Sequence, residues 1–119
     1  ALAICEAVYG PDHPTVAIRL SNLGLVLQDL GDLQGARSNL ERALAIDQAV
    51  YGPEHPAVAA NLFNLGALLV ESGELKEAAF LLKKAQSIYF RYLGPEHDTT
   101  VSVSTWVKGV SDMMDRDTN

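Results

Sequence analysis

The sequence is short of cysteine, of positive charge and of long apolar runs. Cys5 is the single cysteine among 119 residues, which excludes an internal disulfide and a thiolate metal cluster and favours a cytoplasmic protein. Nine lysines and arginines stand against fifteen aspartates and glutamates, so no basic surface is expected for nucleic acid or an anionic membrane. No apolar run approaches the roughly 20 residues of a membrane span, and residues 1–8 lack the basic start of a signal peptide.

The sequence also lacks the short motifs that accompany common catalytic sites. It contains no Gly-x-Gly-x-x-Gly, no phosphate-binding Gly-Lys-Ser/Thr loop, no His-Glu-x-x-His and no Gly-x-Ser-x-Gly. Its histidines and most of its carboxylates are explained by the repeat described below or by exposed helix faces. We therefore expect neither an enzyme nor a cofactor.

What the sequence does contain is an internal repeat. The segment Tyr-Gly-Pro-Asp/Glu-His-Pro begins at Tyr9 and Tyr51, and a related segment begins at Leu93, so the interval is 42 residues both times. Residues 9–50 and 51–92 align without a gap and share 18 identities. A repeat of this length is typical of solenoids, in which each unit buries its apolar faces against its neighbours.

The repeat divides a single domain, residues 1–119, into four parts. Residues 1–8 match the end of the first full repeat and are read as the end of a preceding one. Residues 9–50 and 51–92 are the two full repeats, and residues 93–119 are a partial third repeat with a capping helix and tail. Because the sequence begins inside a repeat and without methionine, we expect a longer parent protein.

Turn residues divide each full repeat into two helices. Pro14 and Pro56 suit the first position of a helix, where the missing N–H costs nothing. Gly31 suits a helix end and Asp32 suits the start of the next helix, while Glu74 is a weaker cap in the second repeat. Apolar residues spaced three and four apart predict the buried faces: Val16, Leu20, Leu23, Leu27 and Leu30 in the first helix, and Leu33, Ala36, Leu40, Ala43, Leu44 and Ile46 in the second. No segment resembles a strand, so the fold is predicted to be all-α.

The helical pattern resembles that of tetratricopeptide repeats. The matching residues are Leu20, Leu23, Gly24, Leu27, Ala36, Leu40 and Ala43, and in the second repeat Leu62, Leu65, Gly66, Leu69, Ala78, Leu82 and Ala85. The unit is longer than the usual 34 residues, and its Pro-bounded loop resembles the long repeats of kinesin light chains. The resemblance implies an α-solenoid, a right-handed superhelix of antiparallel helix pairs. Gly24 and Gly66 would each cost about 1 kcal/mol in a helix, so we expect close approach of the two helices there.

The resemblance also implies a groove for a protein or peptide segment, lined by the first helix of each repeat. If the residues of the tetratricopeptide pattern face the second helix, a stripe on the opposite side of each first helix lines the groove. The stripe contains Ile18, Ser21, Asn22, Leu25 and Asp29 in the first repeat, and Ala60, Phe63, Asn64, Ala67 and Glu71 in the second. In the third repeat Trp106 occupies the position of the two Asn residues. In this family such an Asn commonly bonds the peptide backbone, to which an amide offers a donor and an acceptor. Bridging of neighbouring helices is the alternative role for Asn22 and Asn64, and packing against the preceding helix is the alternative for Trp106.

The charge of the stripes bears on the chemistry of the partner, and the ends of the solenoid allow an alternative function. Kinesin light chains hold acidic cargo peptides, but neither stripe contains lysine or arginine, and only Arg19 lies beside one. An apolar or basic partner is therefore predicted, with Asp29 and Glu71 at one end as partner contacts or as solvated carboxylates. The alternative is an architectural segment that associates end to end without a peptide ligand.

Three histidines raise the question of a metal site. His13, His55 and His97 occupy equivalent loop positions, so they are spread along the solenoid at the scale of roughly 8 to 10 Å set by helix packing. Zinc ligands must all lie about 2 Å from the ion. We therefore expect structural or capping roles and no metal.

Overall fold

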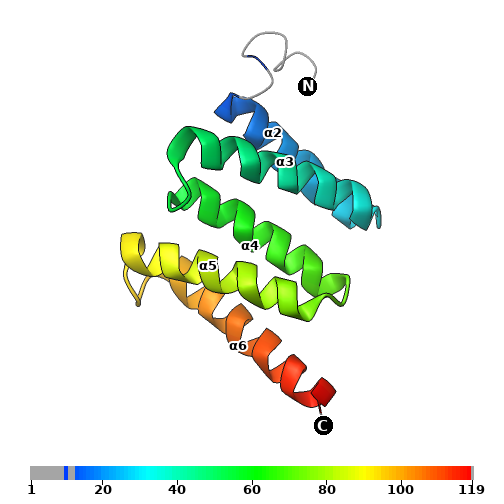
Figure 1. The fold of residues 1–119 in the computed structure, drawn as a ribbon, viewed down its shortest axis with the longest axis vertical. Coiled ribbons are helices and arrows are strands. Elements are labelled where there is room, and N and C mark those ends of the chain that lie inside the picture. Colours follow the sequence, from blue (N-terminus) through cyan, green and yellow to red (C-terminus); the bar gives the residue numbers. More distant parts are fainter. Residues whose placement is uncertain (1–9, 11–12, 119) are drawn as a thin grey trace.

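The fold is a stack of antiparallel helices that follow one another along the long axis (Figure 1). The computed structural model describes residue 10 and residues 13–118; the predicted end of a preceding repeat, residues 1–8, lies outside them. The helices are α2 (Pro14–Asp29), α3 (Leu33–Tyr51), α4 (Pro56–Glu71), α5 (Leu75–Leu93) and α6 (Asp98–Thr118). The described residues contain no strand, in agreement with the predicted all-α fold.

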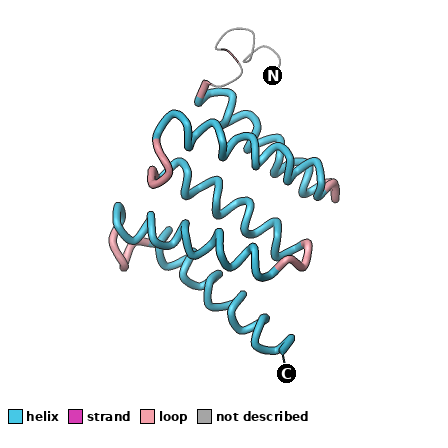
Figure 2. The backbone as a smooth tube through the Cα atoms, viewed as in Figure 1, coloured by secondary structure: helices cyan, strands magenta, loops and turns pink. Residues whose placement is uncertain are grey.

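Two kinds of turn alternate between the two edges of the stack (Figure 2). Short turns join α2 to α3 and α4 to α5 within a repeat, and the Gly-Pro-Glu-His loops join α3 to α4 and α5 to α6. The first helices of the repeats are therefore α2, α4 and α6, and the second helices are α3 and α5. This order agrees with the predicted solenoid of helix pairs.

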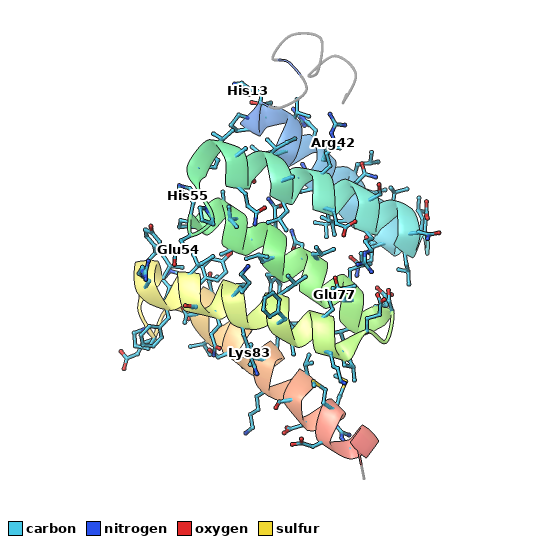
Figure 3. The ribbon with its side chains drawn as sticks, viewed as in Figure 1. His13, Arg42, Glu54, His55, Glu77 and Lys83 are labelled. Atoms are coloured by element: carbon cyan, nitrogen blue, oxygen red, sulfur yellow. The ribbon has the colours of Figure 1, made fainter. Side chains whose placement is uncertain are left out.

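A histidine caps the start of each first helix. The Nδ1 atom of His13 accepts a 3.0 Å hydrogen bond from the backbone N–H of Thr15, and Pro14 occupies the first turn as predicted. Nδ1 of His55 accepts from Ala57 at 3.0 Å, and that of His97 accepts from the backbone N–H two residues on at 3.1 Å. His13 and His55 lie at the same edge of the stack, where α2 and α4 begin (Figure 3). The predicted capping role of the histidines is thus present in the structure.

The turn between α2 and α3 follows the sequence prediction. Gly31 has a positive φ of 88°, which a side chain would strain, and its N–H donates to the carbonyl of Gln28. Asp32 caps α3 by accepting a 2.9 Å hydrogen bond from the backbone N–H of Gly35. Glu74, the predicted weaker cap, makes no side-chain capping bond to α5.

The two mid-helix glycines lie where the helices of one repeat approach most closely. A Cβ atom on Gly24 would stand 2.9 Å from Cγ of Leu40, and one on Gly66 would stand 2.8 Å from Cγ of Leu82. Both leucines are completely buried. The predicted close approach is confirmed, because any side chain at these two positions would overlap a core leucine.

The predicted buried face of α2 was wrong at two positions. Leu30 is 76% exposed because the helix ends at Asp29 and Leu30 lies in the turn. Leu23 is 38% exposed, whereas its equivalent in the next repeat, Leu65, is buried against Ala36 and Leu40 of α3. Leu65 therefore faces the second helix of the preceding repeat, and within the described residues no helix precedes α2 to cover Leu23 in that way.

Candidate functional site

A pocket of about 210 Å³ opens between the first helices of the two full repeats. We call it the α2–α4 pocket. Its lining comes from three helices: Ile18, Ser21 and Asn22 on α2, Asp47 on α3, and Ala57, Ala60, Asn61 and Asn64 on α4. The pocket thus combines small apolar walls with five polar side chains.

Hydrogen bonds between side chains join the three helices at this pocket. The hydroxyl of Ser21 donates to Oδ1 of Asn61 at 2.7 Å, and Nδ2 of Asn61 donates to Oδ2 of Asp47 at 2.6 Å. An ionised carboxylate only accepts hydrogen bonds, so the amide nitrogen of Asn61 must face Asp47 and its oxygen must face Ser21. The network therefore fixes the orientation of Asn61.

Asp47 is a carboxylate that is nearly removed from solvent. Its exposed fraction is 7%, although it lies about one turn from the end of α3 and lines the pocket. Burial raises the pKa of Asp47 above its usual range, and the hydrogen bond from Asn61 and positive charge on His55 lower it in part. Among the ion pairs of the described residues, none joins a lysine or arginine to Asp47. The direct contact that stabilises the negative charge of Asp47 is therefore the hydrogen bond from the neutral amide of Asn61.

The structure brings five of the predicted site residues together at this pocket. They are Ile18, Ser21, Asn22, Ala60 and Asn64. The side-chain amides of Asn22, which is exposed, and Asn64, which is half-buried, form no hydrogen bond with another described residue. At this pocket, the hydrogen bond between the two first helices is instead made by Ser21 and Asn61.

The other predicted site residues lie outside the pocket. Leu25 is exposed, Ala67 is half-buried, and Asp29 is exposed at the end of α2. Glu71 is tied to the neighbouring repeat, because its Oε2 atom accepts a 2.8 Å hydrogen bond from Nε2 of Gln28. The structure therefore does not gather these four residues at the α2–α4 pocket.

Phe63 and Trp106 form an aromatic pair between α4 and α6. Their ring centroids are 5.6 Å apart and the planes meet at 86°, an edge-to-face arrangement. Trp106 remains 38% exposed, so it packs against the preceding repeat and also presents part of its ring to solvent. The groove, by which we mean the surface of the predicted stripes on α2, α4 and α6, thus has a polar pocket between α2 and α4 and an aromatic pair between α4 and α6.

Sequence reasoning missed the two residues at the base of the pocket, Asp47 and Asn61. The repeat itself contained the signal. At the position of Asp47 the neighbouring repeats have Cys5 and Tyr89, and at the position of Asn61 they have Arg19 and Val103. Two polar residues that appear together in only one copy indicate a contact specific to the junction between these two repeats.

The part of the chain described by the structure contains no group of three or more His, Cys, Asp or Glu side chains placed to hold a metal ion. Each of His13, His55 and His97 uses its Nδ1 atom to cap its own helix. His55 also stacks on Tyr51 with ring centroids 4.3 Å apart. Each of the three histidines therefore caps the start of a different helix.

In the described ranges, no helix combines the length and the apolar character needed to cross a membrane.

Antiparallel helix pairs that recur every 42 residues and pack by glycine-to-leucine contacts define an α-solenoid repeat protein. The family model for the tetratricopeptide repeat matches residues 1–46 and 16–90. The chain therefore belongs to the tetratricopeptide repeat family, whose members generally serve protein–protein interaction and are typically scaffolds without enzymatic activity. The comparison with curated proteins found no match.

Solved structures of repeat proteins resemble this chain closely in fold. A kinesin light chain-type protein of Podosopora anserina with nearly identical TPR-like repeats superposes with a TM-score of 0.85 at 25% identity, over 92% of this chain and 52% of that one. BtubC (BKLC) from P. vanneervenii has a TM-score of 0.85 at 20% identity, over 93% of this chain and 44% of that one. This chain thus spans about half the length of these structures, and its repeats are of the kinesin light chain-like type.

Proposed function

We propose that this chain binds an extended segment of a partner protein along the groove formed by α2, α4 and α6. The observation that carries the proposal is the state of Asn22 and Asn64. Both line the α2–α4 pocket, both lie at the same place in successive repeats, and neither side-chain amide is bonded to another described residue. Each amide can donate to a peptide carbonyl and accept from a peptide N–H.

The charges around the groove favour an apolar or basic segment over an acidic one. No lysine or arginine lines the α2–α4 pocket, whereas the carboxylate of Asp47 does. The partly exposed ring of Trp106 on Phe63 supplies apolar surface one repeat further along. An acidic segment would meet a buried negative charge with no cation to offset it.

A peptide selection tests this proposal. A random peptide library is selected in parallel against the unmodified chain and against the Asn22→Ala/Asn64→Ala double variant, with helicity checked by circular dichroism. Gln34→Ala is the matched control, because it removes an exposed amide from α3 that does not line the α2–α4 pocket. We expect peptides that the unmodified chain and the control retain and the double variant loses. Equal binding by the double variant, or no enrichment by the unmodified chain, would contradict the proposal.

The exposed apolar residues of α2 support a second candidate, end-to-end association without a peptide ligand. Leu23, Val26 and Leu30 are 38%, 52% and 76% exposed. The corresponding surface at the other end is more polar, because α6 has Ser104, Lys108 and Ser111 where α4 has Leu62, Gly66 and Leu69. Light scattering separates the two candidates: a mass that rises with concentration and falls on Val26→Gln favours association, and a constant monomer mass excludes it.

A further inference from the structure

We infer that the α2–α4 pocket accepts a lysine or arginine side chain of the bound segment, with Asp47 as its counter-charge. The inference rests on the proposed function, since it names the residue type that the groove would select. Four features of the pocket support it: the acceptors left on Asp47, the absence of a cationic partner, the shape and chemistry of the walls, and the restriction of the site to one junction.

Asp47 retains acceptor capacity that the protein does not use. An ionised carboxylate offers two oxygens with about four lone-pair positions. The one hydrogen bond that the structure gives this carboxylate comes from Nδ2 of Asn61. An ammonium carries three donors and a guanidinium five, so either group can use the remaining positions.

The environment of Asp47 favours a cation over a neutral donor. A carboxylate that is 93% buried, as an exposed fraction of 7% implies, is costly to keep ionised unless it is paired. In the described part of the chain no lysine or arginine supplies that pair, and Nδ1 of His55 accepts a hydrogen bond from Ala57, as a neutral imidazole does. The excess of acidic residues, a net charge of −6, adds a long-range attraction for positive ligands.

The walls of the pocket suit the aliphatic stem of a basic side chain. Ile18, Ala57 and Ala60 supply apolar surface, and Asn22 and Asn64 contribute polar groups. The volume of about 210 Å³ is several times the roughly 30 Å³ that one water occupies in the liquid. Lysine and arginine combine a methylene stem with a charged end, which matches apolar walls beside a buried carboxylate.

The site occurs at one junction of the described repeats. Asn61 is replaced by Val103 in the third repeat, and Asp47 by Tyr89, so the junction between α4 and α6 has Phe63 and Trp106 in contact instead of a carboxylate. A single acidic pocket would set the register of the bound segment, because among the described repeats its basic residue could enter at only one place.

The test uses two small probes that differ in charge. Acetyl-arginine amide and acetyl-citrulline amide have nearly the same shape, but citrulline is neutral. Each is titrated into the chain, and into Asp47→Asn, while the side-chain amides of Asn61 and Asn64 are followed by ¹H–¹⁵N NMR. Asn at position 47 still accepts the hydrogen bond from Asn61, so the fold should be preserved, and a melting curve checks this. Asp112→Asn, which removes an exposed carboxylate of α6 outside the pocket and outside the groove, is the matched control.

We expect saturable shifts at both amides with the arginine probe, about tenfold weaker binding of the citrulline probe, and loss of the difference in Asp47→Asn but not in Asp112→Asn. Equal binding of the two probes, no binding of arginine, or an unchanged preference in Asp47→Asn would overturn the inference. The peptide selection reports separately on the proposed function: enriched peptides without a preferred basic position would leave peptide binding intact and refute the pocket for a basic side chain. A failed selection with a positive arginine titration would refute peptide binding by the groove and retain the pocket.

Discussion

Asp47 accepts a 2.6 Å hydrogen bond from the side-chain amide of Asn61, and this bond joins the second helix of one repeat to the first helix of the next. Because Asn61 also accepts from Ser21 of α2, three helices meet in one polar chain at the base of the α2–α4 pocket. The same pair of residues therefore contributes to the repeat junction and supplies the negative charge of the pocket. Its structural and electrostatic effects can be separated by experiment.

The charge of Asp47 is predicted to lower the stability of the free chain at neutral pH. Its pKa is raised by burial, so the folded state binds the proton more tightly than the unfolded state does. The resulting penalty is present above the folded pKa and is relieved as pH falls toward the unfolded value of about 3.9. Asp47→Asn should therefore melt at a higher temperature than the unmodified chain at pH 7, and the gap should close as pH falls toward 4.

His55 must be considered in this measurement, because a positive charge on its ring would lower the pKa of Asp47, in the opposite direction from burial. The pH series is therefore repeated in a His55→Asn background, which keeps an acceptor for the capping bond and carries no charge, and the Asp47→Asn gap should again close as pH falls. Asp29→Asn is the exposed control and should show no gap. A gap for Asp47→Asn that grows as pH falls would contradict the raised pKa.

Gly66→Ala is predicted to destabilise the chain despite the better helix propensity of alanine. The added Cβ would stand 2.8 Å from two atoms of Leu82, which is fully buried. Overpacking of this kind costs about 1 to 3 kcal/mol, and the propensity gain of up to about 1 kcal/mol offsets part of it. With the full offset, urea unfolding should show a net loss of up to about 2 kcal/mol.

Gly109→Ala is the matched control for this prediction. Gly109 is also inside a helix, but a Cβ atom there would have nothing within 4 Å. The substitution should gain up to about 1 kcal/mol through helix propensity alone. If Gly66→Ala and Gly109→Ala stabilise the chain equally, the close approach of α4 to α5 does not constrain position 66.

His55→Ala is predicted to weaken the start of α4. The variant loses the hydrogen bond from the backbone N–H of Ala57 to Nδ1 and the stacking contact with Tyr51. Loss of an N-cap costs roughly 1 kcal/mol. His55→Asn should recover most of this loss, because the side chain of asparagine can accept the same hydrogen bond. Unfolding curves of the two variants distinguish a capping role from a role of the imidazole itself.

Much of the fold could be predicted from the sequence because most of the residues that start, end and pack the helices recur in both full repeats. Pro14, Gly31 and Asp32 act through their own backbone and nearest neighbours, so their roles were readable without knowledge of tertiary structure. Gly24 was readable because a glycine inside a helix at a fixed period needs a packing reason. Leu23 was misassigned because its burial depends on a helix of the neighbouring repeat, which periodicity within one helix does not identify.

The candidate site was predictable where it follows the repeat and not where it departs from it. Asn22 and Asn64 were found because they recur, and the structure places both at one pocket. Asp47 lies on a second helix and reaches the pocket only through the packing of α3 against α4, so no stripe drawn on a first helix could include it. Its deviation from Cys5 and Tyr89 could have indicated a contact specific to this repeat, but not the partner across the junction.

Trp106 is predicted to report directly on occupation of the groove. It is the one tryptophan of the sequence, it lies edge-on to Phe63, and 38% of it is exposed. A bound segment that extends from the α2–α4 pocket across α4 to α6 would remove part of the ring from water. Addition of a selected peptide should therefore move the fluorescence maximum to shorter wavelength in a saturable way.

The Asn22→Ala/Asn64→Ala variant should lose the shift, because the backbone contacts that hold the segment are absent. A Phe63→Leu variant should bind the peptide but start from a different emission maximum, because the edge-to-face contact is lost. Saturable binding with no change at Trp106 would show that the segment does not reach α6 and is held by the first two repeats alone.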